Sequence, residues 1–357
     1  TCMHGKFVLH CDGKHKLHHG DWILLTVGTH YLRWDAANGK LSTSFVPLVY
    51  MMCKQHETTG ACKMLLLGLI YVAKHYFDAD LKPVACMADH SDGFYNAYKH
   101  CFPGVKFGNC YPHIMRKWKE GQYCTKTWAH FDDVTDHIQT IHMASSTEMR
   151  DLLIDLCGQL WDSWPGGKKA TTTFWNSYCV EPWSNWSLGC FYSMFTTPSN
   201  QVQESWHKQL LESRIPGLFR GSTESVFKHA LPQLIAMDAT FIPTTLCFEV
   251  PAIPKNMMKS ALWYVDFQTT HIHIDKLADG TFTYFILRKD NPLDYERINK
   301  RIMLIWREAM KGLLAYDYLE LYERVELLSD VVHSLHYVWE PPDAVSYTHL
   351  RAHETDS

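Results

Sequence analysis

Short apolar runs separated by polar turns make up the first 120 residues of the chain. The runs are rich in β-branched and aromatic residues, a composition that favours strands. The pattern predicts strands at Phe7 to Cys11, Trp22 to Thr29, Phe45 to Met52, Pro83 to Met87 and Val105 to Cys110. This part of the chain is therefore expected to form a sheet.

Two helices are predicted between the later strands. The first is ACKMLLLGLIYVAKHYF, and His56-Glu57-Thr58-Thr59 before it is typical of a helix start, with Glu57 favoured by the helix dipole in the first turn. The second is GFYNAYKHCF, which Ser91 or Asp92 can cap, Asp92 being the favoured cap, and which Pro103-Gly104 ends. Three strands, a helix, a strand, a helix and a strand predict an α/β fold with an RNase H-like mixed sheet.

Helical periodicity replaces the strand pattern from about Ile114 to Trp164, and Trp164-Pro165-Gly166-Gly167 interrupts it. We interpret this segment as an α-helical insertion that precedes the last helix of the sheet domain. The predicted boundaries are 1–120 for the RNase H-like core, 121–195 for the insertion and 196–215 for the closing helix of the core.

The C-terminal part carries both kinds of signal. LWYVDF, HIHIDKL and TFTYFILR are predicted as two or three strands, and YERINKRIMLIWREAM as a helix. Residues 216–345 are therefore expected to form a C-terminal α+β region of unassigned role. Residues 346–357 contain SYTHLRAHET, which resembles a translated sequencing adaptor, and we expect them to be a non-native tail.

The composition of the chain limits the class of protein to which it can belong. With 46% apolar and 20% charged residues over 357 positions, the chain is globular, and no apolar run reaches the roughly 20 residues of a membrane span. A formal charge of −4 argues against strong general affinity for nucleic acid, so such a partner requires a local basic patch. The 12 cysteines include no C-x-x-C pair and are expected to be reduced thiols of an intracellular protein. Because the chain starts at Thr1 without Met, an N-terminal portion is expected to be missing.

Three acidic residues are the strongest candidates for chemistry. Asp12 closes the run KFVLHCD, Asp89 closes KPVACMAD, and Glu204 lies in SNQVQESWH at the start of a later helix. Each alone has an ordinary interpretation, as a turn residue or as an exposed helix residue. Together, two strand Asp residues and a Glu from a distant helix can converge to hold two divalent metals, an arrangement that suits phosphodiester chemistry.

The segment MADHSDGFYNAYKHCFPGVKFGNCYPHIMRKW resembles the central signature of Mutator-like (MULE) transposases. The family's Asp after a strand, its Asn-Ala pair, its Phe-Pro stop and its C-x-x-H are matched by Asp89, Asn96-Ala97, Phe102-Pro103, Cys110 and His113. Asp12-Gly13 resembles the family's first catalytic motif, and Asn200 with Glu204 resembles its last. The resemblance covers about residues 6–215.

The resemblance implies a DDE-type DNA transposase in which Asp12, Asp89 and Glu204 are catalytic and bind two Mg²⁺ or Mn²⁺ ions. Water would first cut a strand at the transposon end, and the exposed 3′-hydroxyl would then attack target DNA. It also implies DNA as the partner, a homo-oligomer that holds two ends together, a nuclear location and no membrane association.

Other residues are candidates for supporting roles. Glu57, in the segment HETT that also resembles the family, can assist at the site, although first-turn stabilisation is the simpler interpretation. Cys110 and His113 have the spacing of two zinc ligands, which leaves a tetrahedral site incomplete, or they have a structural or DNA-contacting role. Val202, Trp206 and Leu210 form an apolar stripe that places Asn200 and His207 with Glu204 on another face. Arg116, Lys117 and Lys119 form either a solvated basic face or, in the functional interpretation, a contact to phosphates.

Departures from the family pattern keep alternatives open. Lys14, Gln201 and His207 replace residues that are usual in the family, so a catalytically inactive or domesticated DNA-binding regulator is the main alternative. An RNase H-like nuclease that does not join strands is another. A second alignment would place the first motif on LTVGTH, with Val27 instead of an Asp. We prefer Asp12, because the strands and the helix that follow it then have the order that the fold requires.

Overall fold

The computed structural model describes residues 7–18, 21–35, 40–54, 56–144, 147–191, 198–210, 221–240, 272–276, 282–287 and 321–340. The chain divides into two compact units. The first comprises Thr1–His142 and Trp161–Ala252, and the second Met143–Leu160 and Ile253–Ser357. The predicted tail, the segment LWYVDF and the helix YERINKRIMLIWREAM lie outside the described residues.

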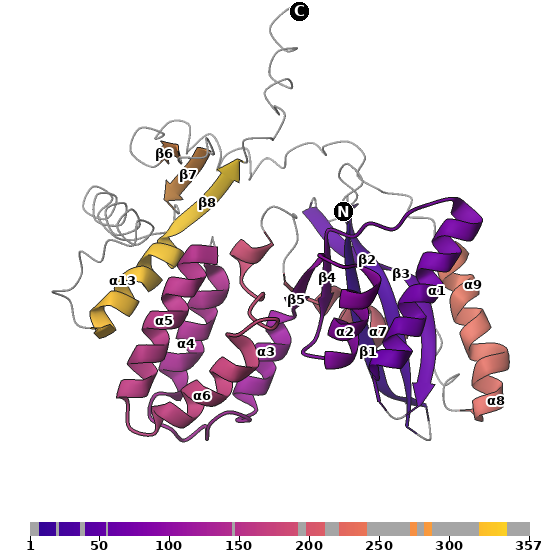
Figure 1. Cartoon of the computed structure of the whole chain (residues 1–357), viewed down its shortest axis with the longest axis horizontal. Helices are drawn as coiled ribbons and strands as arrows, with labels where there is room; N and C mark the ends of the chain where they lie inside the picture. Colours follow the sequence, from indigo (N-terminus) through magenta and orange to yellow (C-terminus); the bar gives the residue numbers. More distant parts are fainter. Residues whose placement is uncertain are drawn as a thin grey trace, which may run out of the picture. The chain divides into compact units, whose positions relative to one another are not determined.

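The first unit is a mixed α/β structure built on a five-stranded sheet (Figure 1). Its strands are β1 (Val8–His18), β2 (Trp22–Asp35), β3 (Lys40–Lys54), β4 (Ala85–Ala88) and β5 (Lys106–Asn109). Their order is β3-β2-β1-β4-β5, in which β2 runs antiparallel to β1 and β3, while β1, β4 and β5 are parallel. The five predicted strand positions are confirmed.

The prediction that Asp12 closes the first strand is wrong. The β1–β2 hairpin continues the ladder, with Asp12 opposite Thr26 and Gly13 opposite Leu25. Backbone pairing with β2 therefore extends β1 to His18, through polar residues that the apolar pattern does not mark as strand.

Helices cover both faces of the sheet and enclose two separate cores. On one face, α1 (Thr59–Phe77) and α2 (Asp92–Cys101) pack on Leu9 and Cys11 of β1. On the other face lie α7 (Gln201–Gln209), α8 (Thr223–Ser225), the π-helix η5 (Val226–Ala230) and α9 (Leu231–Thr240). The apolar stripe predicted for the closing helix is confirmed, since Trp206 and Leu210 are buried with Val202 packed against them.

Helices also fill the interval between β5 and α7. They are α3 (Tyr111–Lys119), α4 (Phe131–Met143), α5 (Thr147–Ser163), α6 (Gly167–Tyr178) and the short 3₁₀ helix η1 (Leu188–Cys190). Within the first unit, Trp118, Trp161 and Trp186 are fully buried around Phe174. The predicted break is present, because α5 ends at Ser163 and Gly166 adopts a left-handed conformation before α6.

The second unit contains an antiparallel sheet of order β6-β7-β8. Strands β6 (Ile272–Lys276) and β7 (Phe282–Leu287) lie within two of the predicted strand segments. The pattern did not indicate β8 (Leu335–Glu340) or α13 (Leu321–Ser334). Among the described residues, no helix combines the length and apolarity of a membrane span, and no disulfide links two cysteines.

Candidate functional site

A cavity of about 890 Å³ lies beyond the parallel pairing of β1 with β4, at the carboxyl end of β4 and beside the middle of β1. Four carboxylates from separate parts of the sequence line it: Asp12, Glu57, Asp89 and Glu204. Asp12 follows the parallel pairing of β1 with β4, and Asp89 comes directly after Ala88, the last residue of β4. Glu204 reaches the cavity from the first turn of α7. Open α/β sheets generally bind ligands at this end of their parallel strands.

The register of β4 and β5 brings Asp89 beside the start of α3. Ala88 pairs with Asn109, so that Asp89 and Cys110 follow at adjacent strand ends. The Cys110 N–H also donates to the Ala88 carbonyl oxygen over 3.1 Å, which fixes the position of α3. His113, one turn along α3, faces the cavity together with Asp89.

One histidine contacts two of the predicted metal ligands. His113 Nδ1 lies 2.8 Å from Asp89 Oδ1 and 3.3 Å from Glu204 Oε1. Burial alone would lower the pKa of His113, but pairing with Asp89 and the charge of Glu204 outweigh it and raise the pKa. Burial raises the pKa of Asp89, an effect that His113 opposes and the nearby Asp12 and Glu204 charges reinforce. Asp89 and Glu204 keep 31% and 36% of their side-chain surface exposed, so both remain reachable from the cavity.

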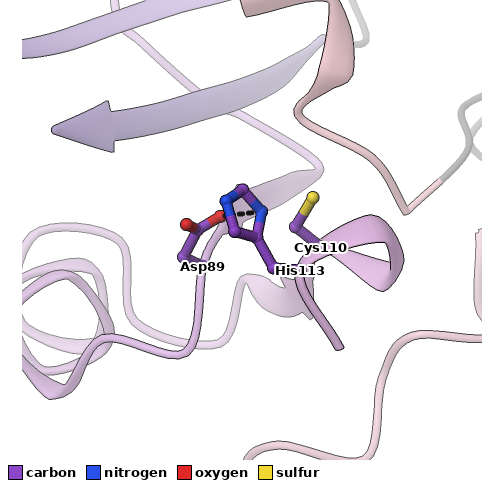
Figure 2. A group of neighbouring side chains, drawn as sticks. All are labelled: Asp89, Cys110 and His113. Carbon is purple, nitrogen blue, oxygen red and sulfur yellow. Dashed lines mark ion pairs between the residues drawn. The ribbon is translucent and has the colours of Figure 1, made fainter. Parts of the chain in front are cut away.

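Asp89, Cys110 and His113 form a compact donor group (Figure 2). A carboxylate oxygen, the thiol sulfur and an imidazole nitrogen all lie within 4.8 Å of one another. The Cys110 thiol is buried, which raises its pKa, and its sulfur accepts the Asn200 backbone N–H over 3.2 Å. Among the described residues, Asp12, Asp89 and Glu204 do not form an equally close trio.

The carboxylate of Asp12 is more buried than those of Asp89 and Glu204. Its Oδ1 accepts the Gly13 N–H over 2.8 Å, and its Oδ2 lies 3.2 Å from His207 Nδ1. The Asp12 side chain is 14% exposed, and that of His207 only 1%. The other ring nitrogen of His207 lies 3.3 Å from the hydroxyl of Thr26, the residue paired with Asp12 across the sheet. The His207 ring is therefore oriented from both sides.

Asn200 fastens α7 to the sheet below the cavity. It is fully buried and occupies the N-cap position of α7, but its side chain makes no capping bond. Instead its Nδ2 donates to the Cys11 carbonyl over 3.0 Å, and its Oδ1 lies 3.0 Å from His10 Nδ1. Gln203 Nε2 adds a bond of 2.9 Å to the Thr26 carbonyl. Asn200, a candidate from the sequence, therefore positions Glu204 and does not line the cavity itself.

Glu57 occupies a different place from the predicted one. Thr58 is the N-cap of α1 and its Oγ1 accepts the Ala61 N–H, so Glu57 precedes the helix and the first-turn interpretation is wrong. Its Oε2 accepts the Ser91 hydroxyl over 3.2 Å, and its Oε1 lies 3.2 Å from His15 Nε2. Burial raises the pKa of Glu57, with the Asp12 and Asp89 charges acting in the same direction and His15 and Ser91 against it.

Two glycines make room for Glu57. A Cβ on Gly13 would lie 1.9 Å from Glu57 Oε1, and one on Gly93 would lie 2.0 Å from the Glu57 carbonyl oxygen. Both contacts are far shorter than packed atoms tolerate. The predicted cap is also corrected, because Ser91 is the N-cap of α2 and Asp92 lies in the first turn; the Ser91 hydroxyl makes no capping bond and is directed to Glu57 instead. Gly13 and Ser91 line the cavity, and sequence reasoning did not assign them to the site.

Cationic side chains surround the carboxylates. Besides His113 and His207, the basic and histidine residues that line the cavity are Lys14, His15, His90, Arg116, Lys117 and Lys208. Lys117 is half-buried and burial lowers its pKa, whereas Lys119 is exposed and lies outside the cavity lining. A local basic rim thus exists on a chain whose net charge is negative.

Three buried polar atoms at the cavity belong to Asp–His pairs. Among the described residues, Asp89 Oδ1 and His113 Nδ1 are buried 2.8 Å from each other, and the buried His207 Nδ1 lies 3.2 Å from Asp12 Oδ2. Buried polar groups in native proteins usually have partners, and here each of the two histidines has a carboxylate. No protein-family model and no curated protein matches this chain. The resemblance to Mutator-like transposases rests on the motif residues alone.

Proposed function

We propose that the protein is a metal-dependent DNA transposase of the DDE type, similar to Mutator-like transposases, on an RNase H-like core. One observation carries the proposal: Asp12, Asp89 and Glu204, spread over nearly 200 residues, line a single cavity. The order of strands and helices also agrees with the one expected of an RNase H-like sheet, with an antiparallel β2 beside the parallel β1, β4 and β5.

The donor chemistry of the cavity fits divalent metal ions. Asp12, Asp89 and Glu204 supply carboxylate oxygens, which Mg²⁺ and Mn²⁺ prefer. Carboxylates from separate elements around one cavity could be shared by two ions about 3.5–4 Å apart. When bound there, such ions would activate the attacking oxygen and stabilise the leaving oxygen of a phosphodiester.

The chain's own residues would orient the DNA and the ligands. Arg116, Lys117 and Lys208 on the cavity wall can contact backbone phosphates, which hold a nucleic acid without reading its sequence. His207 fixes the orientation of Asp12, and Asn200 fixes the helix that carries Glu204. Catalysis of phosphoryl transfer depends mainly on such positioning and on charge stabilisation. A homo-oligomer and a nuclear location belong to the same proposal.

Replacement of Asp89 tests the function directly. Asp89→Asn keeps the side-chain size but removes the charge, whereas Asp92→Asn alters a nearby exposed Asp of α2 that does not line the cavity. With Mg²⁺ or Mn²⁺, wild type and Asp92→Asn are expected to cleave DNA, and Asp89→Asn to be slower by about 100-fold or more. If the folded wild type leaves DNA intact, the proposal fails.

A DNA-binding protein without cleavage is the second candidate. It is favoured by the histidines at the site, because His113 and His207 already pair with carboxylates that metal ligation would require. In that case wild type and Asp89→Asn would bind DNA with similar affinity, and neither would cut it.

A further inference from the structure

The group formed by Asp89, Cys110 and His113 differs in chemistry from the carboxylates around it. It combines one oxygen, one sulfur and one nitrogen donor within 4.8 Å. Mg²⁺ and Mn²⁺ favour oxygen ligands, and a thiol contributes little to sites for such ions. Zn²⁺ accepts all three donor types and commonly has four ligands.

We propose that Asp89, Cys110 and His113 bind a single thiophilic transition-metal ion such as Zn²⁺, with Glu204 as the fourth ligand. Glu204 Oε1 lies 3.3 Å from His113 Nδ1, close to the roughly 3.3 Å that separates two ligands bound at about 2.0 Å in a tetrahedron. Glu204 lies outside the group of three donors within 4.8 Å of one another, so its carboxylate would have to approach them on binding. Asp89 Oδ1 and His113 Nδ1 are buried and only 2.8 Å apart, and they would separate slightly around an ion.

The surroundings of Cys110 suit a metal thiolate. Binding releases the thiol proton to solvent as the sulfur–metal bond forms, which gives the sulfur a negative charge. The Asn200 backbone N–H, 3.2 Å from the sulfur, already points a donor at that charge. Hydrogen bonds of this kind orient metal ligands and stabilise them. Figure 2 shows the thiol, the imidazole and the carboxylate grouped at one place.

The Zn²⁺ site would share ligands with the carboxylate trio. Asp89 and Glu204 would belong both to this centre and to the carboxylate trio, so that the two kinds of ion compete. Zn²⁺ is therefore expected to inhibit a Mg²⁺-dependent reaction of the same cavity. The Zn²⁺ site itself does not depend on DNA cleavage and can exist in a protein that only binds DNA.

Cobalt spectroscopy of the reduced chain tests the site. Co²⁺ substitutes for Zn²⁺, and its absorption reveals whether sulfur is a ligand and whether the ion is four-coordinate. The wild type is expected to bind one Co²⁺ with a sulfur-to-cobalt charge-transfer band that Zn²⁺ abolishes. Cys110→Ser should lose this band. Cys124→Ser, which changes another free and partly buried thiol, should retain it.

A competition assay against a chromophoric chelator measures Zn²⁺ affinity directly, so that the test does not depend on Cys110→Ser alone. His113→Gln and Asp89→Asn are expected to weaken Zn²⁺ binding by about 100-fold or more. Substitution of residues that only hydrogen-bond to metal ligands already lowers metal affinity about 10–100-fold. Circular dichroism verifies that each variant is folded. The proposal is overturned if the wild type shows no sulfur band, if Cys110→Ser keeps it, or if His113→Gln binds Zn²⁺ as tightly as wild type. Absence of DNA cleavage with Mg²⁺ would change none of these results.

Discussion

The two sides of the cavity use the same residue types in different ways. On the β1 side, Asp12 faces His207, and on the β4 side, Asp89 faces His113. Both histidines present Nδ1 to a carboxylate. The β1 pair is nearly inaccessible and tied to the hairpin through Thr26, whereas Asp89 on the β4 side is 31% exposed and has the Cys110 thiol beside it.

The β1 side is therefore the rigid side of the cavity, and the β4 side is the one that can accept different ions. The β1 side is held by backbone contacts and by side chains that have few alternatives, as expected of a positioned ligand. The β4 side groups an oxygen, a sulfur and a nitrogen donor, which allows it to accept ions of different chemistry. Substitutions that disturb one side and leave the other intact test whether the division is real.

The largest expected effect is loss of the space that Glu57 occupies. Gly93→Ala would place a Cβ 2.0 Å from the Glu57 carbonyl oxygen, and backbone atoms cannot move aside cheaply. We expect the free energy of unfolding to fall by about 3 kcal/mol, at the upper end of typical overpacking costs. Denaturant unfolding measures this change.

Gly68 provides the matched control. It lies within α1, is exposed, and an added Cβ would meet nothing within 4 Å. Gly68→Ala is therefore expected to stabilise the protein by about 0.5–1 kcal/mol, since alanine favours the helix. Equal effects of Gly68→Ala and Gly93→Ala would contradict the tight packing of Glu57.

Removal of the Asn200 side chain is expected to have the next largest effect. Asn200→Ala leaves the Cys11 carbonyl and His10 Nδ1 buried without this partner. Such losses cost about 1–3 kcal/mol for each group, so we expect the protein to lose about 2 kcal/mol of stability. The backbone bond to Cys110 remains, and Co²⁺ binding on the β4 side should persist. Gln201→Ala, at an exposed neighbour, should change stability by less than about 0.5 kcal/mol.

The elements were largely predictable, but their contacts were not. Apolar runs marked the five strands because each run is buried within the sheet domain. The spacing of Cys110 and His113 indicated two ligands on one helical turn. Asp89 joins them only through the parallel register of Ala88 with Asn109, a long-range pairing that spacing cannot reveal.

Glu57 shows a second limit of pattern reasoning. Its place depends on which residue caps α1, and the choice between His56 and Thr58 is made by the Thr58 hydroxyl accepting the Ala61 N–H. A shift of two residues in the helix start moves Glu57 from the first turn of the helix to the cavity wall. Gly13 and Gly93 were the available signals, since glycine beside a carboxylate motif indicates a close approach.

The smallest of the three effects, when it is measured over a single pH unit, concerns pH and has opposite signs on the two sides of the cavity. On the β1 side, burial lowers the pKa of His10 to about 4, although its contact with Asn200 acts in the opposite direction. Below about pH 6.5, His10 takes up a proton in the unfolded chain but not in the folded protein. The free energy of unfolding therefore falls with decreasing pH, approaching about 1.4 kcal/mol for each pH unit until the pH reaches about 4. The raised pKa of His113 acts oppositely, giving stability that is lost as the pH rises through it.

A variant isolates the His10 contribution from the carboxylates that titrate in the same range. His10→Gln cannot take up the proton, whereas His100→Gln removes an exposed histidine of α2. Between pH 6.5 and 5.5, the stability advantage of wild type over His10→Gln should shrink by about 1 kcal/mol, because His10 of the unfolded chain is already half protonated at pH 6.5. His100→Gln should follow the wild-type curve. Parallel curves for wild type and His10→Gln would show that His10 is not buried in its neutral form, and the rigid β1 side would lose its main titratable constraint.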